Sequence, residues 1–156
     1  MRAEGVSIES VLLREDLWLT KASWERLADH QAVTAIFGRL AARPTYHLRL
    51  EPLADAGLLL HVVTAGLSPA LEDLETADWR LSEEACAVEI RGTGLFAEED
   101  LIVRLATCLP AEGGLVCLSD TLLTLITARR MAQDVLRSTR LQLEAARLMP
   151  QDAVQR

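Results

Sequence analysis

The residues that offer binding chemistry gather at one predicted helix start, Asp29-His30-Gln31. A helix N-terminus carries positive potential, and the side chains of His30 and Gln31 can donate hydrogen bonds. Together these residues form a candidate binding site for a small ligand. A structural role is the alternative, in which Asp29 only caps the helix and the other two side chains are solvated.

The other reactive residue types form no catalytic or metal-binding pattern. His61 lies in an apolar segment, where a buried, hydrogen-bonded histidine is the simpler interpretation and a ligand contact the alternative. Gly92-Thr93-Gly94 lacks the third glycine of a dinucleotide-binding loop, so relief of crowding at a strand end explains it better. The cysteines, Cys86, Cys108 and Cys117, show no CxxC or Cys/His spacing. The sequence therefore predicts no catalytic residue, no metal site and no cofactor, and hence a protein that is not an enzyme.

Composition narrows the class of protein. The 156 residues include 16 Lys+Arg and 23 Asp+Glu, which gives a net charge of −7. This acidic balance argues against binding to nucleic acid or to an anionic membrane, because both require a basic surface. No segment reaches the roughly 18 apolar residues of a membrane-spanning helix. The N-terminus has no signal peptide, so a cytoplasmic protein is expected.

The elements that must position the candidate residues follow from hydrophobic spacing. In the first half of the chain, Ser68-Pro69 is expected to open a short helix. The other predicted elements here are strands over 6–13 and 17–20 around a turn at 14–16, a helix over 29–42, and strands over 46–50 and 58–64. In the second half they are strands over 79–81 and 86–90 around a turn at 82–84, a helix over 98–110, strands over 115–118 and 122–127, and a helix over 129–148.

The second half repeats the first in the order of its elements. With a spacing of 68 residues, Leu13-Arg14-Glu15-Asp16 aligns with Leu81-Ser82-Glu83-Glu84, and Phe37 aligns with Leu105. Each unit has the order strand, helix, strand, strand, helix, strand, provided that the N-terminal strand completes the second unit. The prediction is an α+β fold of two ferredoxin-like βαββαβ units, interlocked by that strand. A chance match of generic α/β patterns is the alternative.

These units define the predicted domain organisation. The first unit covers residues 13–81. The second covers residues 82–148 and takes the strand at 6–12 as its last strand. Residues 149–156 are expected to form a flexible tail.

The segment Val88–Leu95 resembles the start of the second ACT domain in the regulatory half of aspartate kinases, where a strand is followed by Gly-x-Gly and a helix. The Ser-containing turn Leu118-Ser119-Asp120-Thr121 occupies the place of that family's Thr-Ser turn, and the predicted hairpin at 6–20 resembles the strand pair that opens the regulatory half. The resemblance covers residues 5–140.

The resemblance implies a function and a site. Tandem ACT regions bind small effectors, usually amino acids, at interfaces between ACT domains, and they commonly dimerise. The family's ligand loop corresponds to Leu27–Ala32, which implies contacts from Asp29, His30, Gln31 and Ala32. A second contact segment corresponds to Thr45-Tyr46-His47 and implies Thr45 and His47. The expected protein is a stand-alone regulatory homodimer, with an amino-acid biosynthetic enzyme as its implied partner.

The chain departs from the family pattern at both ligand loops. The loop at Leu27–Ala32 keeps an aspartate but lacks the family's Pro-Gly. The second loop, Ala97-Glu98-Glu99-Asp100, has no glycine, and its three carboxylates would repel a ligand carboxylate. These departures leave a second hypothesis open, in which the protein is a ligand-free ACT-type scaffold that dimerises and binds a partner protein.

Overall fold

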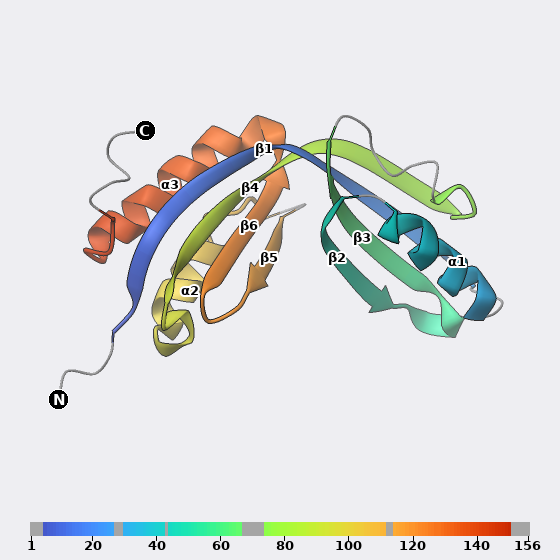
Figure 1. Ribbon diagram of the computed structural model, residues 1–156, viewed down its shortest axis with the longest axis horizontal. Coiled ribbons are helices and arrows are strands. Elements are labelled where there is room, and N and C mark those ends of the chain that lie inside the picture. The colour runs from blue at the N-terminus through green and yellow to red at the C-terminus, as the bar shows by residue number, and fades with distance from the viewer. Residues whose placement is uncertain (1–4, 27–29, 43, 67–73, 112–113, 151–156) are drawn as a thin grey trace. The chain divides into compact units, whose positions relative to one another are not determined.

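The computed structural model describes residues 5–26, 30–42, 44–66, 74–111 and 114–150. In these ranges six strands form one sheet in the order β2-β3-β1-β4-β6-β5, together with three α-helices (Figure 1). The strand pairs β1–β3, β2–β3 and β5–β6 are antiparallel. The strands are β1 (Ser7–Trp24), β2 (Thr45–Pro52), β3 (Leu58–Ala65), β4 (Trp79–Thr93), β5 (Leu115–Leu118) and β6 (Leu122–Ala128). The helices are α1 (His30–Ala41), α2 (Glu99–Ala106) and α3 (Ala132–Ala145).

The chain divides into two compact units. The first, which we call the internal unit, is Asp16–Ala85. The second, the terminal unit, combines Met1–Glu15 with Cys86–Arg156. Strands β1 and β4 each contribute one part of their length to each unit.

The internal unit contains the strands in the order β2-β3-β1-β4. Side chains alternate between the two faces of a strand, so Leu60 and Val62 of β3 share one face and His61 lies on the other. Leu60 and Val62 pack in one apolar cluster with Ile36 and Leu40 of α1. The remaining buried members of this core are Ala22, Trp24 and Leu74.

The terminal unit contains the strands in the order β1-β4-β6-β5. Leu123 and Leu125 of β6 belong to one face of the sheet, and they pack in the same core as residues from both α2 and α3. Both helices therefore cover the same face. The buried core is Ile8, Val11, Val88, Ile90, Leu95, Leu101, Leu105, Leu123, Leu125, Val135, Leu136 and Leu143.

The predicted turns at 14–16 and 82–84 are wrong, because both segments lie inside continuous strands. β1 is 18 residues long and β4 is 15 residues long. Ile8 of β1 is buried in the core of the terminal unit, and Trp24 is buried in the core of the internal unit. The polar residues between them occupy the part of the strand that leaves one core before it enters the other, so they interrupt the apolar pattern without turning the chain.

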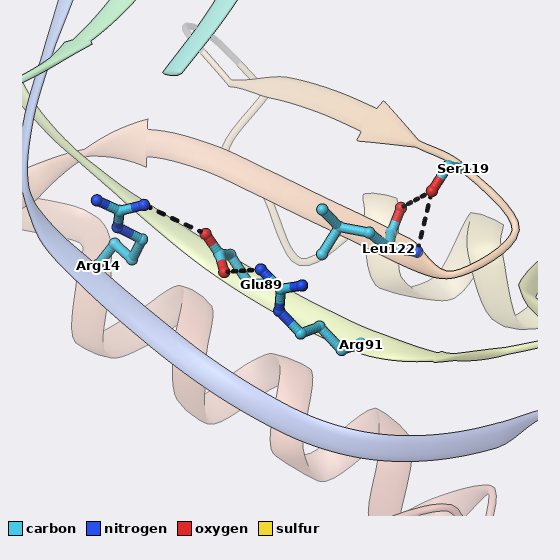
Figure 2. Close-up of polar contacts among 5 residues, drawn as sticks. All are labelled: Arg14, Glu89, Arg91, Ser119 and Leu122. Carbon is cyan, nitrogen blue, oxygen red and sulfur yellow. Dashed lines mark hydrogen bonds and ion pairs between the residues drawn. The ribbon is translucent and has the colours of Figure 1, made fainter. Parts of the chain in front are cut away.

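An ion pair shows how a polar residue is accommodated inside β1. Glu89 of β4 is buried, with only 5% of its side chain exposed. The Nη2 atom of Arg91 donates to its Oε2 at 3.2 Å, and Nη1 of Arg14 lies 3.9 Å from its Oε1 (Figure 2). Because an unpaired buried carboxylate is costly, the two arginines stabilise the strands at the position where sequence spacing had predicted a turn.

The predicted helix over 29–42 is confirmed over its described part, with Ile36 and Leu40 buried and Phe37 half-buried. The other two helices are shorter than predicted. α2 ends at Ala106, and α3 begins after a 3-10 turn at Arg129–Met131. Of the predicted helix at Ser68-Pro69, only Leu74 lies within the described residues, and it is fully buried.

The end of α3 lies at Ala145, three residues before the predicted end at residue 148. Arg147 has a left-handed backbone with φ 58°, and the N–H of Leu148 donates to the carbonyl of Leu143 at 2.8 Å, a hydrogen bond that terminates the helix. Leu141, an apolar residue of this helix, is 57% exposed. Leu143 is buried instead, because it lies eight residues after Val135 and thus on the same helical face.

Candidate functional site

An open cavity of about 940 Å³ lies at the end of the internal unit where β1 ends and β2 turns into β3. It is lined by Glu25, Arg26, Leu53, Ala54, Asp55 and Ala56. The chain enters α1 only four residues after Arg26. One lining residue, Arg26, is therefore close in sequence to the predicted ligand-binding helix start.

The turn that forms one wall is held in an unusual backbone conformation. The N–H of Leu53 donates to the carbonyl of Gly57 at 2.9 Å, and the N–H of Gly57 donates to the carbonyl of Ala54 at 3.2 Å. Between them, Asp55 and Ala56 both have left-handed φ values, 57° and 62°. Left-handed conformations are costly for residues other than glycine, and such strain is concentrated at functional sites.

Gly57 allows this turn to lie against the end of β1. A Cβ atom at this position would lie 2.9 Å from the carbonyl oxygen of Trp24 and 3.0 Å from that of Glu25. Both neighbouring atoms belong to the backbone, which cannot move aside as a flexible side chain would. The absence of a side chain at Gly57 therefore brings the two walls of the cavity together.

The second wall is fixed by hydrogen bonds to the segment before β4. The N–H of Glu25 donates to Oδ2 of Asp78 at 2.6 Å, and the N–H of Asp78 donates to the carbonyl of Ser23 at 2.9 Å. In addition, Nε1 of Trp24 donates to Oγ1 of Thr76 at 3.2 Å. These contacts position the residues that precede α1.

The charges that line the cavity have both signs. The guanidinium group of Arg26 can bind a carboxylate through two parallel hydrogen bonds. The carboxylates of Glu25 and Asp55 are acceptors suited to an ammonium group. All three residues are exposed. Sequence reasoning predicted strands over 46–50 and 58–64 but assigned no chemistry to the segment between them, because only the fold brings that segment into one cavity with Arg26.

The predicted site residues lie at two separate ends of α1. Asp29 lies outside the described residues, and His30, Gln31 and Ala32 form the first turn of the helix. Twelve residues give α1 a length of about 18 Å. At its far end, Oγ1 of Thr45 donates to the carbonyl of Leu40 at 3.1 Å. His47 follows on β2, so the fold does not bring Thr45 and His47 to the helix start.

In the terminal unit, the segment between β4 and α2 corresponds to the segment between β1 and α1. Hydrogen bonds to the turn between β5 and β6 close this segment. After β4, the N–H of Leu95 donates to the carbonyl of Asp120 at 3.1 Å, and the N–H of Phe96 donates to its Oδ1 at 3.3 Å. Asp120 belongs to the turn between β5 and β6, which is also closed by hydrogen bonds between Ser119 and Leu122 (Figure 2). The backbone donors of Leu95 and Phe96, in the segment between β4 and α2, are therefore already paired.

The described part of the chain contains no group of three or more His, Cys, Asp or Glu side chains placed to bind a metal ion. No helix within it is long and apolar enough to cross a membrane. Burial raises the pKa of the Cys86 thiol to about 11, so this cysteine stays protonated and unreactive at neutral pH.

Comparison with known proteins identifies the fold. No family model matches the chain. No curated protein matches it. Among solved structures, the ligand-free regulatory subunit of aspartate kinase from Thermus thermophilus is 15% identical with a TM-score of 0.71, and the match covers 87% of this chain and 98% of that one.

Two further structures show the same similarity. The regulatory subunit of aspartate kinase from Thermus flavus is 14% identical with a TM-score of 0.66, over 88% of this chain and 99% of that subunit. Aspartokinase III from E. coli, in complex with aspartate and ADP, is 18% identical with a TM-score of 0.64, over 91% of this chain and 35% of the enzyme. The chain therefore has the fold of an aspartate kinase regulatory subunit.

Proposed function

We propose that the protein is a stand-alone regulatory protein of two ACT units that binds a small effector, an amino acid, in the cavity of its internal unit. The observation that carries this proposal is the cavity itself, whose lining combines Arg26 with Glu25 and Asp55, and Arg26 precedes α1 by four residues. The fold shared with aspartate kinase regulatory subunits supports a regulatory rather than a catalytic role.

The strand orders support two ferredoxin-like units. In the internal unit, the first strand is β1, and the order β2-β3-β1-β4 is that of a βαββαβ unit. In the terminal unit, β4 acts as the first strand and β1 as the last, so β1-β4-β6-β5 is the same order. The N-terminal strand then completes the second unit, and the two units are interlocked by β1 and β4.

The proposed binding mode uses both charges of an amino acid. Arg26 and the backbone N–H groups at the start of α1 bind the carboxylate, since a helix N-terminus favours anions. Glu25 or Asp55 binds the ammonium group. Asp29, His30, Gln31 and Ala32 remain proposed contacts, because they follow Arg26 closely in the sequence. Thr45 and His47 belong to the other end of α1, so one amino acid is not expected to reach them as well.

The open side of the cavity suggests how the protein transmits binding. We propose that the chain forms a homodimer in the cytoplasm and that a second ACT unit covers the effector. Binding across such an interface would favour one arrangement of the dimer, and a partner enzyme of amino-acid biosynthesis would respond to that arrangement.

A thermal-shift screen tests the proposal. Purified protein is heated with each of the twenty amino acids at about 1 mM. A ligand at about 100 times its Kd stabilises by about 2.7 kcal/mol, which raises the Tm of a domain of this size by several degrees. Arg26→Gln is expected to abolish the shift. Arg104→Gln, the same charge change at an exposed position of α2, is the matched control.

A ligand-free scaffold that binds a partner protein is the second candidate function. The observation that favours it is the closed loop of the terminal unit, where Asp120 already accepts the backbone hydrogen bonds. A screen without any shift, or a shift that Arg26→Gln leaves unchanged, contradicts the effector site. Co-purification of a stoichiometric partner would then support the scaffold.

A further inference from the structure

A row of basic side chains crosses three neighbouring strands of the internal unit. In the antiparallel register, His61 of β3 lies opposite Lys21 of β1 on one side and opposite Arg49 of β2 on the other. Side chains at paired positions lie on the same face of a sheet. We call Lys21, His61 and Arg49 the basic row. It occupies the face opposite to the core residues Leu60 and Val62.

Within the described ranges, no carboxylate lies at ion-pair distance from the positive charges of the basic row. The ion pairs found among the described residues include neither Lys21 nor Arg49. Glu51 raises the pKa of His61, but its effect is smaller than the opposing effects of Lys21 and Arg49. Two cations on the strands that flank β3, outside the ion pairs of the described residues, are unusual in a chain with a net charge of −7.

His61 supplies a hydrogen-bond donor between the two cations. The residue is half-buried, and its Nδ1 is shielded from solvent without a hydrogen-bond partner in the described part of the chain. Burial lowers the pKa of His61, and Lys21 and Arg49 lower it further. When Nε2 carries a proton, this nitrogen can donate a hydrogen bond to a ligand on this face.

We propose that the basic row binds the oxyanion of a phosphate group, with Lys21 and Arg49 on its two sides and His61 between them. Opposed residues of an antiparallel pair have Cα atoms about 4.5–5.5 Å apart, so all three side chains can reach one anion. Phosphate has several acceptor oxygens, which match the ammonium, imidazole and guanidinium donors. Free phosphate and the phosphate of a small organic ester share this chemistry. The site is separate from the proposed amino-acid cavity.

Binding at this site is expected to depend on pH. A dianion beside His61 favours the imidazolium form and thus raises its pKa from the lowered value. Lys21 from β1, and Arg49, His47 and Glu51 from β2, are the charged or titratable groups that act on this ring. Phosphate binding therefore takes up a proton, so the affinity for a given phosphate species rises as the pH falls through the pKa of His61 in the bound state.

NMR titration of the full chain tests the proposal. The imidazole signal of His61, assigned with His61→Gln, is followed against pH without ligand, with inorganic phosphate, and with O-phosphoserine. Sodium chloride at equal ionic strength is the control. The expected result is a pKa increase of His61 with phosphate or with O-phosphoserine but not with chloride. Tighter binding of O-phosphoserine would identify an organic ester as the source, and tighter binding of phosphate would identify the free anion.

Charge-removing variants provide the second arm. Lys21→Gln combined with Arg49→Gln is expected to weaken phosphate binding at least 10-fold, whereas Arg104→Gln leaves it unchanged. Circular dichroism confirms that each variant is folded. If the double variant does not fold, Arg49→Gln alone is used, since Arg49 is exposed. An equal response to chloride, or phosphate binding that survives loss of these charges, overturns the proposal.

Discussion

The two units differ in the loop before their first helix, which is closed by hydrogen bonds in the terminal unit and lines an open cavity in the internal unit. In the terminal unit, Asp120 accepts hydrogen bonds from the N–H groups of Leu95 and Phe96. In the internal unit, the turn at Leu53–Gly57 bonds to itself, and it lines an open cavity together with Glu25 and Arg26. The same order of strands thus produces one closed position and one open position.

The lengths of the two turns explain this difference. Three residues, Ser119–Thr121, separate β5 from β6, and five residues, Leu53–Gly57, separate β2 from β3. The short turn brings Asp120 to the N–H groups of Leu95 and Phe96 in the loop before α2, so these donors are paired within the chain. The longer turn leaves such a position open, so we expect only the internal unit to bind an effector.

Among the predicted changes, truncation of the equivalent helix residues Leu105 and Phe37 should lower the free energy of unfolding the most. Leu105→Ala is expected to lower the free energy of unfolding by about 2–5 kcal/mol, because Leu105 is only 1% exposed and its loss leaves a cavity. Phe37→Ala should cost less, since Phe37 is only half-buried. Urea denaturation monitored by circular dichroism measures both values. Equal losses would show that the two helices are packed equally well.

Replacing Gly92 or Gly57 by alanine adds a methyl group where another part of the backbone lies close. These substitutions should cause the next largest loss in the free energy of unfolding. At Gly92 a Cβ would clash with the carbonyl oxygen of Ser7, and at Gly57 it would meet those of Trp24 and Glu25. Each alanine substitution is expected to cost about 1–3 kcal/mol, with Gly92→Ala the more severe. Gly38→Ala, where a Cβ meets nothing within 4 Å, is the control. A neutral Gly57→Ala would contradict the close approach of the turn to β1.

Removal of the closing carboxylate should have a moderate effect on stability. Asp120→Ala is expected to cost about 1 kcal/mol, because it removes the charge-assisted hydrogen bond to the N–H of Phe96. Asp120→Asn keeps an acceptor oxygen and should cost less. Thermal unfolding compares the two variants. An Asp120→Ala variant as stable as the wild type would show that this contact does not close the loop.

Protonation of His47 and His61 should change the free energy of unfolding the least. The pKa of His47 is lowered by burial and by Arg49, and that of His61 by burial and by neighbouring cations. Because the unfolded chain binds these protons more readily, their contribution to stability is present above pH 6.5 and is lost as the pH falls through the lowered pKa values. Urea denaturation at pH 8 and pH 5.5 should therefore show a smaller acid-dependent loss for His47→Gln/His61→Gln than for the wild type.

Sequence spacing predicted most elements but not the paths of the two longest strands. The alternation of Leu48 and Leu50 and the helical spacing of Ile36 and Leu40 reflect local geometry, which holds in any tertiary context. The polar residues 14–16 were interpreted as a turn, because local patterns cannot distinguish a turn from a strand that passes between two cores.

In the candidate site, too, local sequence signals predicted some features and the tertiary structure decided the others. The sequence by itself determined the start of α1 at His30 and the turn before β3, because helix periodicity and the glycine at position 57 are local signals. Only the tertiary structure decided that Arg26 and Asp55 line one cavity and that Thr45 lies at the far end of α1. Those placements depend on strand order and register, which join residues far apart in the chain and therefore leave no local pattern.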